Sequence, residues 1–136
     1  MIITICGSIK FFDEMLEVKN QLESVGHIAL MPVKADGVDY WAEDGANRVE
    51  AKKKFEFISE HLNKIDNSEA ILVVNITKGD IENYVGANTF LEIGYAHHKK
   101  KKIYFLNPVP DQKYIIDEIL TVEPIVLNGN FLKLND

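Results

Sequence analysis

The sequence predicts a single α/β domain in which helices cover both faces of a five-stranded parallel sheet. Short β-branched runs alternate along the chain with segments of helical hydrophobic period, which is typical of βαβ units. The clearest run, residues 70–74, is apolar at every position, as expected of a parallel strand covered on both faces. The chain has 136 residues, the size of one domain, and no repeat or linker segment divides residues 1–136.

The first half of the chain predicts two strands and two helices. β-branched residues at the N-terminus indicate a buried strand, and Gly7-Ser8 after it indicates a turn. Apolar residues then recur at spacings of three and four, which predicts an amphipathic helix that Gly26 ends. A strand with Pro32 near its end, a long acidic loop and a second helical stripe follow. We expect these elements at residues 2–6, 11–25, 27–33, 33–47 (the loop) and 51–65.

The second half continues the alternation and completes a doubly wound, flavodoxin-like order. Its elements are expected at residues 70–74 (strand), 77–87 (loop), 88–98 (helix), 102–106 (strand), 111–120 (helix) and 124–127 (strand). Parallel strands joined through helices require right-handed crossovers. In such sheets ligands bind beyond the carboxyl ends of the strands, at the switch point beside the first strand. We therefore expect function where Gly7-Ser8, the loop after Pro32 and residues 75–92 meet.

Composition excludes several classes of protein. Hydrophobic residues make up 46% of the chain, which argues against disorder, and one cysteine excludes a disulfide framework or a four-cysteine zinc site. No apolar run approaches the ~20 residues that cross a bilayer, and residues 1–5 lack the features of a signal peptide, so a cytoplasmic protein is expected. The formal net charge of −6 argues against binding nucleic-acid polymers but permits a small anionic ligand.

The first turn, Cys6-Gly7-Ser8-Ile9-Lys10, is the first candidate site. Glycine allows a close backbone approach, and the start of the next helix offers free N–H groups to an anion. Ser8 adds a hydroxyl and Lys10 a cation, which suits a phosphate or a sugar hydroxyl. The alternative is a tight βα turn in which Ser8 only caps the helix.

The second candidate is Glu92, one turn into the helix expected at residues 88–98. A carboxylate fixed near a helix N-terminus stays ionised and can attack an electrophilic sugar carbon. The alternative is structural, because Thr89-x-x-Glu92 also fits a capping box, in which the glutamate accepts a backbone N–H. The spacing alone does not separate these interpretations.

Two segments of the chain together resemble the nucleoside 2-deoxyribosyltransferase-like superfamily. They are Cys-Gly-Ser-Ile-Lys at the first turn and Glu92-Ile-Gly-Tyr-Ala96, about 85 residues later. The first turn is most similar to that of the 2′-deoxynucleoside 5′-phosphate N-hydrolases, which reads Cys-Gly-Ser-Ile-Arg. The resemblance covers about three quarters of the chain, from the first to the fourth strand. It implies that Glu92 attacks C1′ of a deoxyribose and expels the base, and that water or a second base then releases the sugar. It also implies that residues 7–10 (Gly7, Ser8, Ile9 and Lys10) hold the sugar-phosphate end, that no metal or cofactor takes part, and that the chain forms at least a dimer.

The chain departs from this pattern at three of four supporting positions. Thr4 stands where the hydrolases have a tyrosine, and His61 stands where they carry a catalytic aspartate. Glu69 takes the place of the acid that opens the third strand. Gly86 replaces an aspartate or serine six residues before the nucleophile. These changes indicate either a branch with another substrate or a site kept for binding only.

Other side chains at the same edge have two interpretations each. His61 could protonate a leaving base, since an unperturbed histidine titrates near neutrality, or could be a polar residue at a helix end. Tyr40 and Trp41 could stack on a nucleobase or anchor their loop. Asn88 and Thr89 could replace the polar group missing at the helix start.

Cys6 is expected to be a buried structural residue, because lone cysteines are mostly buried and no paired histidine is suggested. The basic run of residues 97–102 is expected at a helix C-terminus, where the dipole favours cations, and no spacing indicates a metal site. The leading hypothesis is an enzyme that cleaves or transfers the N-glycosidic bond of a nucleoside or nucleotide. The alternative is a non-catalytic nucleotide-binding or sensor module on the same fold. A flavodoxin-like redox protein is less favoured, because the first turn lacks a Ser/Thr-rich phosphate cradle.

Overall fold

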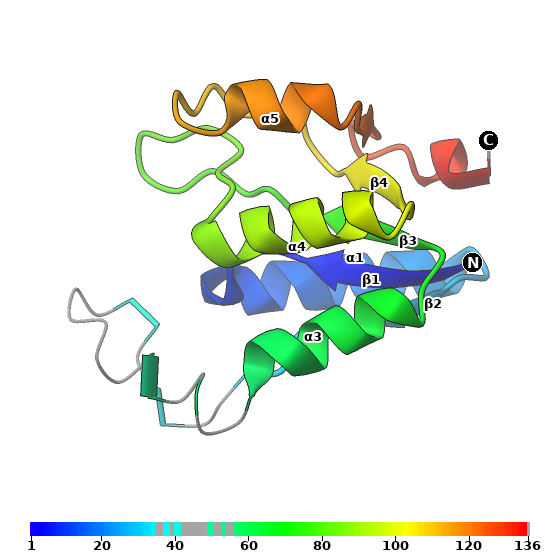
Figure 1. The fold of residues 1–136 in the computed structure, drawn as a ribbon. Coiled ribbons are helices and arrows are strands. Elements are labelled where there is room, and N and C mark those ends of the chain that lie inside the picture. Colours follow the sequence, from blue (N-terminus) through cyan, green and yellow to red (C-terminus); the bar gives the residue numbers. More distant parts are fainter. Residues whose placement is uncertain (35–36, 39, 42–48, 51–52, 54–55, 136) are drawn as a thin grey trace.

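The computed structural model describes residues 1–34, 37–38, 40–41, 49–50, 53 and 56–135. Strands and helices alternate along these residues as predicted (Figure 1). The elements are β1 (Ile2–Cys6), η1 (Ile9–Phe11), α1 (Phe12–Ser24), β2 (Ile28–Leu30), α3 (Phe57–Asp66), β3 (Ala70–Val73), α4 (Ala87–His98), β4 (Lys102–Phe105), α5 (Ile116–Thr121), β5 (Ile125–Val126) and η2 (Phe131–Asn135). No helix among them is long and apolar enough to cross a membrane.

The strands form one parallel sheet in the order β2-β1-β3-β4-β5, which confirms the predicted flavodoxin-like fold class. The chain moves from β1 to β2 in one direction and then crosses over to β3 on the other side of β1. The switch point therefore lies between β1 and β3. Their carboxyl ends, at Cys6 and Val73, are paired in register and open onto the crevice where such folds bind ligands.

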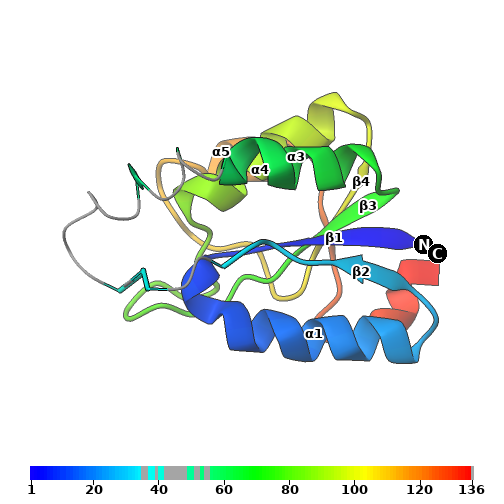
Figure 2. The same cartoon turned by 90° about the horizontal axis from the view of Figure 1, so that it is seen from below.

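Two hydrophobic layers hold the helices to the sheet, α1 and η2 on one face and α3, α4 and α5 on the other (Figures 1 and 2). Alternation along β1 divides its side chains between the layers. Ile3 and Ile5 pack in the α1 layer, whereas Cys6 packs in the α3/α4 layer. The α3/α4 layer is thus the layer in which side chains with reactive groups pack against the sheet.

The structure corrects several predicted bounds. The second strand covers only Ile28–Leu30, because Pro32 has no N–H to extend the ladder. The helix expected at residues 111–120 begins only at Ile116, since the chain leaving Pro110 first forms a turn. η2 was not predicted. Most of the predicted loop at 33–47, and Ala51 and Phe55 of the second helical stripe, lie outside the described residues.

Candidate functional site

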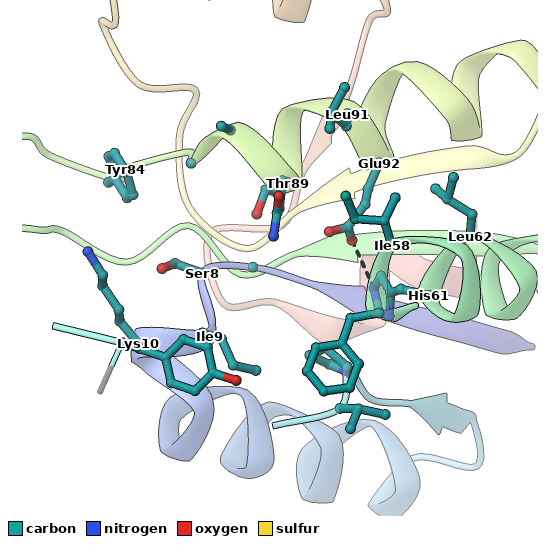
Figure 3. A pocket seen from close by; sticks show the side chains of 18 residues that line it. Ser8, Ile9, Lys10, Ile58, His61, Leu62, Tyr84, Thr89, Leu91 and Glu92 are labelled. Carbon is teal, nitrogen blue, oxygen red and sulfur yellow. Dashed lines mark ion pairs between the residues drawn. The ribbon is translucent and has the colours of Figure 1, made fainter. Parts of the chain in front are cut away.

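A cavity of about 320 Å³ opens at the carboxyl ends of β1 and β3, where the topology predicts ligand binding. The first turn, the segment after β2, α3 and the start of α4 all contribute to its lining (Figure 3). Its lining residues are Gly7, Ser8, Ile9, Lys10, Pro32, Val33, Tyr40, Phe57, Ile58, His61, Leu62, Tyr84, Gly86, Ala87, Asn88, Thr89, Leu91 and Glu92. Apart from Trp41, every residue that the sequence predicted for the site lies on this cavity.

The first turn presents Ser8 to the cavity, and its hydroxyl makes no helix-capping hydrogen bond. The backbone carbonyl of Ser8 instead accepts from the N–H of Phe11 at 2.9 Å. Gly7 has a packing reason to be glycine, because a Cβ there would lie 3.0 Å from Met15 Sδ and 3.1 Å from the Val74 carbonyl. The capping alternative for the Ser8 side chain is therefore wrong, and its hydroxyl remains available to a ligand.

The α4 helix starts at Ala87 with Gly86 as its N-cap residue, and no side chain caps it. Thr89 thus lies inside the helix, so a capping box between Thr89 and Glu92 does not form. The Glu92 side chain instead extends from α4 towards α3, where its Oε2 lies 2.8 Å from His61 Nε2 (Figure 3). Glu92 is held across the cavity floor by its position in the fold and not by its own backbone.

Cys6, His61 and Glu92 form a buried cluster in which β1, α3 and α4 each contribute one residue. The side chains of His61 and Glu92 are 8% and 12% exposed, and Cys6 lies beneath them with no exposure. His61 Nε2 is 3.6 Å from Cys6 Sγ. Within the described residues Glu92 Oε2 has no aligned hydrogen-bond donor, although His61 Nε2 is 2.8 Å away. His61 Nδ1 is also buried and has no partner in the part of the chain that the structure describes.

Burial raises the pKa of the Cys6 thiol well above its ordinary value, and the negative charge of Glu92 raises it further. The thiol is therefore protonated at neutral pH, which argues against a cysteine nucleophile. The expectation that no histidine pairs with Cys6 is wrong. The pairing spans 55 positions and depends on how α3 is rotated against the sheet, so no local pattern reveals it.

The buried hydroxyl of Thr89 also suggests that the cavity binds a ligand. It lies between Ser8 and Glu92 in the view of Figure 3, on the cavity side of α4. The residue is 1% exposed, and its Oγ1 has no hydrogen-bond partner among the residues that the structure describes. A buried hydroxyl without a partner costs about 1–3 kcal/mol. A ligand hydroxyl or phosphate oxygen in the cavity could supply the missing partner.

Of the aromatic residues near the cavity, Tyr40 and Tyr84 line it and Trp41 does not. Tyr40 is buried and lines it, whereas Trp41 is 59% exposed, lies outside the lining and packs edge-on against Phe11 at 5.7 Å. Lys10 Nζ lies 5.4 Å from the Trp41 ring centroid. Of the two interpretations of Trp41, this arrangement favours the loop anchor. Tyr84, which the sequence did not single out, also lines the cavity, and Lys78 Nζ lies 4.7 Å from its ring centroid.

Gly86 is held close beneath Tyr84. A Cβ at Gly86 would lie 3.3 Å from the Tyr84 ring, so a larger residue here would displace the aromatic side chain. Asn88 follows at the start of α4 and also lines the cavity. Gly86, which stands where the hydrolases that the sequence resembles have a polar residue, is thus in tight contact with an aromatic ring.

Thr4 and Glu69 lie away from the cavity. Thr4 Oγ1 is fully buried and 2.6 Å from Ser68 Oγ, which in turn donates to the Lys64 carbonyl at 2.8 Å. Glu69 is exposed at the start of β3. Thr4, which stands where the hydrolases that the sequence resembles have a tyrosine, is therefore part of a buried hydrogen-bonded pair.

The loop before α4 is braced from a distant segment. The side chain of Gln112 accepts from the Val85 N–H at 2.6 Å and donates to the Val85 carbonyl at 3.0 Å. The amides of Asn75 and Asn107 also bind each other's backbone, at distances of 2.9–3.0 Å. The Gln112 contacts fix the chain just before Gly86 and thereby the start of the helix that carries Glu92, and the Asn75 and Asn107 contacts join the segments that follow β3 and β4.

The basic run at residues 97–102 lies at the end of α4 remote from the cavity, as expected. His97 and His98 are exposed in the last turn of the helix. Lys99 Nζ lies 3.5 Å from Asp66 on α3, whose carboxylate also accepts from the Tyr95 hydroxyl at 2.8 Å. These residues connect α4 to α3 at the end opposite the site.

No protein-family model and no curated protein matches the chain. A solved structure that shares its fold is that of a 2-deoxyribosyltransferase from the psychrotolerant bacterium Bacillus psychrosaccharolyticus, described as a biocatalyst for synthesis of antiviral and antitumoral nucleosides. The two chains are 14% identical, with a TM-score of 0.58, and the similarity covers 87% of this chain and 81% of that one. At this identity the likeness establishes the fold.

Proposed function

We propose that this protein is an enzyme that cleaves or transfers the N-glycosidic bond of a nucleoside or nucleotide. The observation that carries the proposal is the Glu92 carboxylate, which lies on the floor of a cavity that also contains Ser8. The fold shared with a deoxyribosyltransferase supports the same chemistry. We place the chain in the nucleoside 2-deoxyribosyltransferase-like superfamily, and its first turn favours the 2′-deoxynucleoside 5′-phosphate N-hydrolases as nearest relatives.

The proposed reaction has two displacements at C1′ of the sugar. A Glu92 carboxylate oxygen forms a bond to C1′ while the C1′–N bond breaks, and the electron pair of that bond leaves with the base, which takes up a proton. Water or the nitrogen of a second base then attacks C1′ and releases Glu92. A carboxylate beside C1′ stabilises the oxocarbenium-like transition state, and covalent capture divides one difficult step into two easier ones.

In this proposal His61 positions Glu92. Its Nε2 lies 2.8 Å from the carboxylate and its Nδ1 is buried, so the ring holds Glu92 and does not reach towards a leaving base. Ser8, Lys10 and the unpartnered Thr89 hydroxyl provide donors to the sugar and its 5′ substituent. Tyr40 and Tyr84 offer aromatic surface to the base.

One observation favours the alternative, a non-catalytic nucleotide-binding or sensor module. The Glu92 carboxylate already forms an ion pair with His61 on the cavity floor, and the Thr4 hydroxyl is buried against the Ser68 hydroxyl. Tight binding of a nucleotide without turnover, across a panel of nucleosides and nucleotides, would establish this alternative.

The test is chromatography of a mixture of nucleosides and nucleotides incubated with the protein, with and without an acceptor base. We expect free base without the acceptor, or exchanged nucleoside with it. Glu92→Gln should lower the rate by at least about 10³-fold, because a neutral amide is a poor nucleophile. Glu118→Gln, on the exposed surface of α5, is the matched control and should keep full activity. Release of base by Glu92→Gln at the wild-type rate would overturn the proposal.

We also propose that the chain acts as a homodimer or larger homo-oligomer on a small-molecule substrate. Leu91 and Ile58 line the cavity and are 57% and 45% exposed, so a second copy could cover them. Sedimentation of wild-type protein and of Leu91→Glu compares their masses in solution. A monomeric wild type would contradict the expectation. The cytoplasmic location expected from the sequence stays a prediction.

A further inference from the structure

Three metal-ligating side chains converge beneath the cavity from three different elements: Cys6 from β1, His61 from α3 and Glu92 from α4. Their ligand atoms all lie within 4.8 Å of one another. We propose that these residues form a three-ligand site for a thiophilic divalent cation of the zinc type. This proposal goes beyond the glycosidic activity and does not depend on it.

The distances in the cluster suit a tetrahedral metal site. With usual Zn–S and Zn–N bond lengths, tetrahedral angles place sulfur and nitrogen about 3.6 Å apart, and Zn–N and Zn–O bonds place nitrogen and oxygen about 3.4 Å apart. Cys6 Sγ and His61 Nε2 are already 3.6 Å apart. His61 Nε2 and Glu92 Oε2, at 2.8 Å, need only a small rotation of the glutamate side chain.

Charge and access also fit a divalent ion. The Cys6 thiol would release its proton when the metal binds. The resulting thiolate, a carboxylate and a neutral imidazole carry two negative charges, so a divalent cation would neutralise the buried cluster. Thiolate and imidazole ligands together favour zinc over magnesium or calcium. Cys6 lies beneath His61 and Glu92, both of which line the cavity, so the ion would enter from the cavity and keep a fourth position open there. An open fourth position is typical of zinc sites that bind water or a ligand.

The sequence did not reveal this site, because its three ligands are isolated in the chain and share no motif spacing. Metal binding would also affect the proposed reaction. Glu92 cannot attack C1′ while it coordinates the ion, so metal binding and glycosyl transfer would exclude each other.

Cobalt(II) titration of the purified protein tests the proposal, with absorption spectroscopy as the readout. We expect saturation at one equivalent, a thiolate-to-cobalt charge-transfer band in the near ultraviolet and intense visible bands of four-coordinate cobalt. Zinc should displace the cobalt. Cys6→Ser should abolish the charge-transfer band. Because Cys6 is in the core, Glu92→Gln provides a second variant that keeps the thiol, and we expect it to bind cobalt at least tenfold more weakly.

The matched control is the double variant His97→Ala/His98→Ala, which removes the exposed histidines of α4 and should leave the titration unchanged. Absence of the charge-transfer band in wild-type protein would overturn the proposal. So would a Glu92→Gln protein with wild-type affinity, or binding that disappears in the His97→Ala/His98→Ala protein. The spectra report metal binding and not catalysis. A protein that does not bind cobalt can therefore be distinguished from one that does not release base.

Discussion

Two polar clusters lie on the α3/α4 side of β1, and they differ in how completely their hydrogen bonds are satisfied. Thr4 and Ser68 are buried together, and Ser68 also donates to the Lys64 carbonyl. Two positions further along the strand, Cys6 packs against His61 and Glu92 under an open cavity. We name these the closed pair (Thr4 and Ser68) and the open cluster (Cys6, His61 and Glu92).

The contrast separates a structural role from a functional one. Nearly all buried polar groups in folded proteins have partners, so those without one need an explanation. The closed pair meets this rule. Among the residues that the structure describes, the open cluster and its neighbour Thr89 leave three buried polar atoms without a hydrogen-bond partner: His61 Nδ1, Glu92 Oε2 and Thr89 Oγ1. Departures from local satisfaction are expected where a site must bind something else.

After Glu92→Gln, the largest effect is expected at His61 in the open cluster. His61→Ala removes the group that holds the Glu92 carboxylate and should lower kcat for base release on the order of 10²-fold, with a smaller change in KM. Initial rates over a range of substrate concentrations measure both. His98→Ala, at the far end of α4, is the control. An unchanged kcat would show that Glu92 needs no positioning by His61.

The next effect is expected in the closed pair and concerns stability. Ser68→Ala leaves the Thr4 hydroxyl buried without a partner and should lower the free energy of unfolding by about 1–3 kcal/mol. Urea denaturation measures this difference. The double variant Thr4→Val/Ser68→Ala removes both hydroxyls and should recover most of the loss. Both variants should release base at the wild-type rate. A large drop in activity would contradict a purely structural role for the closed pair.

A smaller effect is expected at Thr89, where stability and binding should move in opposite directions. Thr89→Val removes an unpartnered hydroxyl at nearly constant volume, so the free energy of unfolding should stay the same or rise by up to about 1 kcal/mol. If the hydroxyl binds substrate, KM should rise about tenfold, which corresponds to one lost hydrogen bond. Clear destabilisation by Thr89→Val would show that the hydroxyl has a structural partner.

The smallest effect concerns the pH dependence that Cys6 contributes. Burial and the charge of Glu92 raise the pKa of the folded thiol above its ordinary value of 9.0. The unfolded chain therefore loses the thiol proton at lower pH than the folded chain does. Its contribution to stability is fully present below the unfolded pKa and is lost as pH rises through the folded pKa. Relative to Cys6→Ala, the wild-type free energy of unfolding should fall in urea titrations as the pH rises above the ordinary thiol pKa of 9.0. Parallel pH profiles for the two proteins would contradict the raised pKa.

The fold and the site's location were predictable because they depend on local patterns and on topology. The apolar run at residues 70–74 and the alternation of strands with helices were sufficient to predict a parallel sheet covered by helices on both faces. The switch-point rule then placed Ser8 and Glu92 on one cavity.

The internal contacts of the site could not be predicted in this way. The approach of His61 to Cys6 and Glu92 depends on how α3 is rotated and packed against the sheet. The pair between Thr4 and Ser68 joins positions 64 residues apart, and the Gln112 brace joins positions 27 residues apart. Such contacts arise from tertiary packing, and neither spacing nor propensity encodes them. Tyr84 was missed for a related reason, because a loop aromatic acquires its orientation only from the contacts around it.

The brace between Gln112 and Val85 has a consequence for how the chain can diversify. Val85 is fixed through both its backbone groups, and Tyr84 donates its N–H to the Ile76 carbonyl at 3.1 Å. The ends of the segment at residues 77–83 are thus anchored independently of what lies between them. Insertions or deletions there can reshape the mouth of the cavity without shifting the helix behind it, and loop-length libraries at these positions offer a route to altered substrate choice.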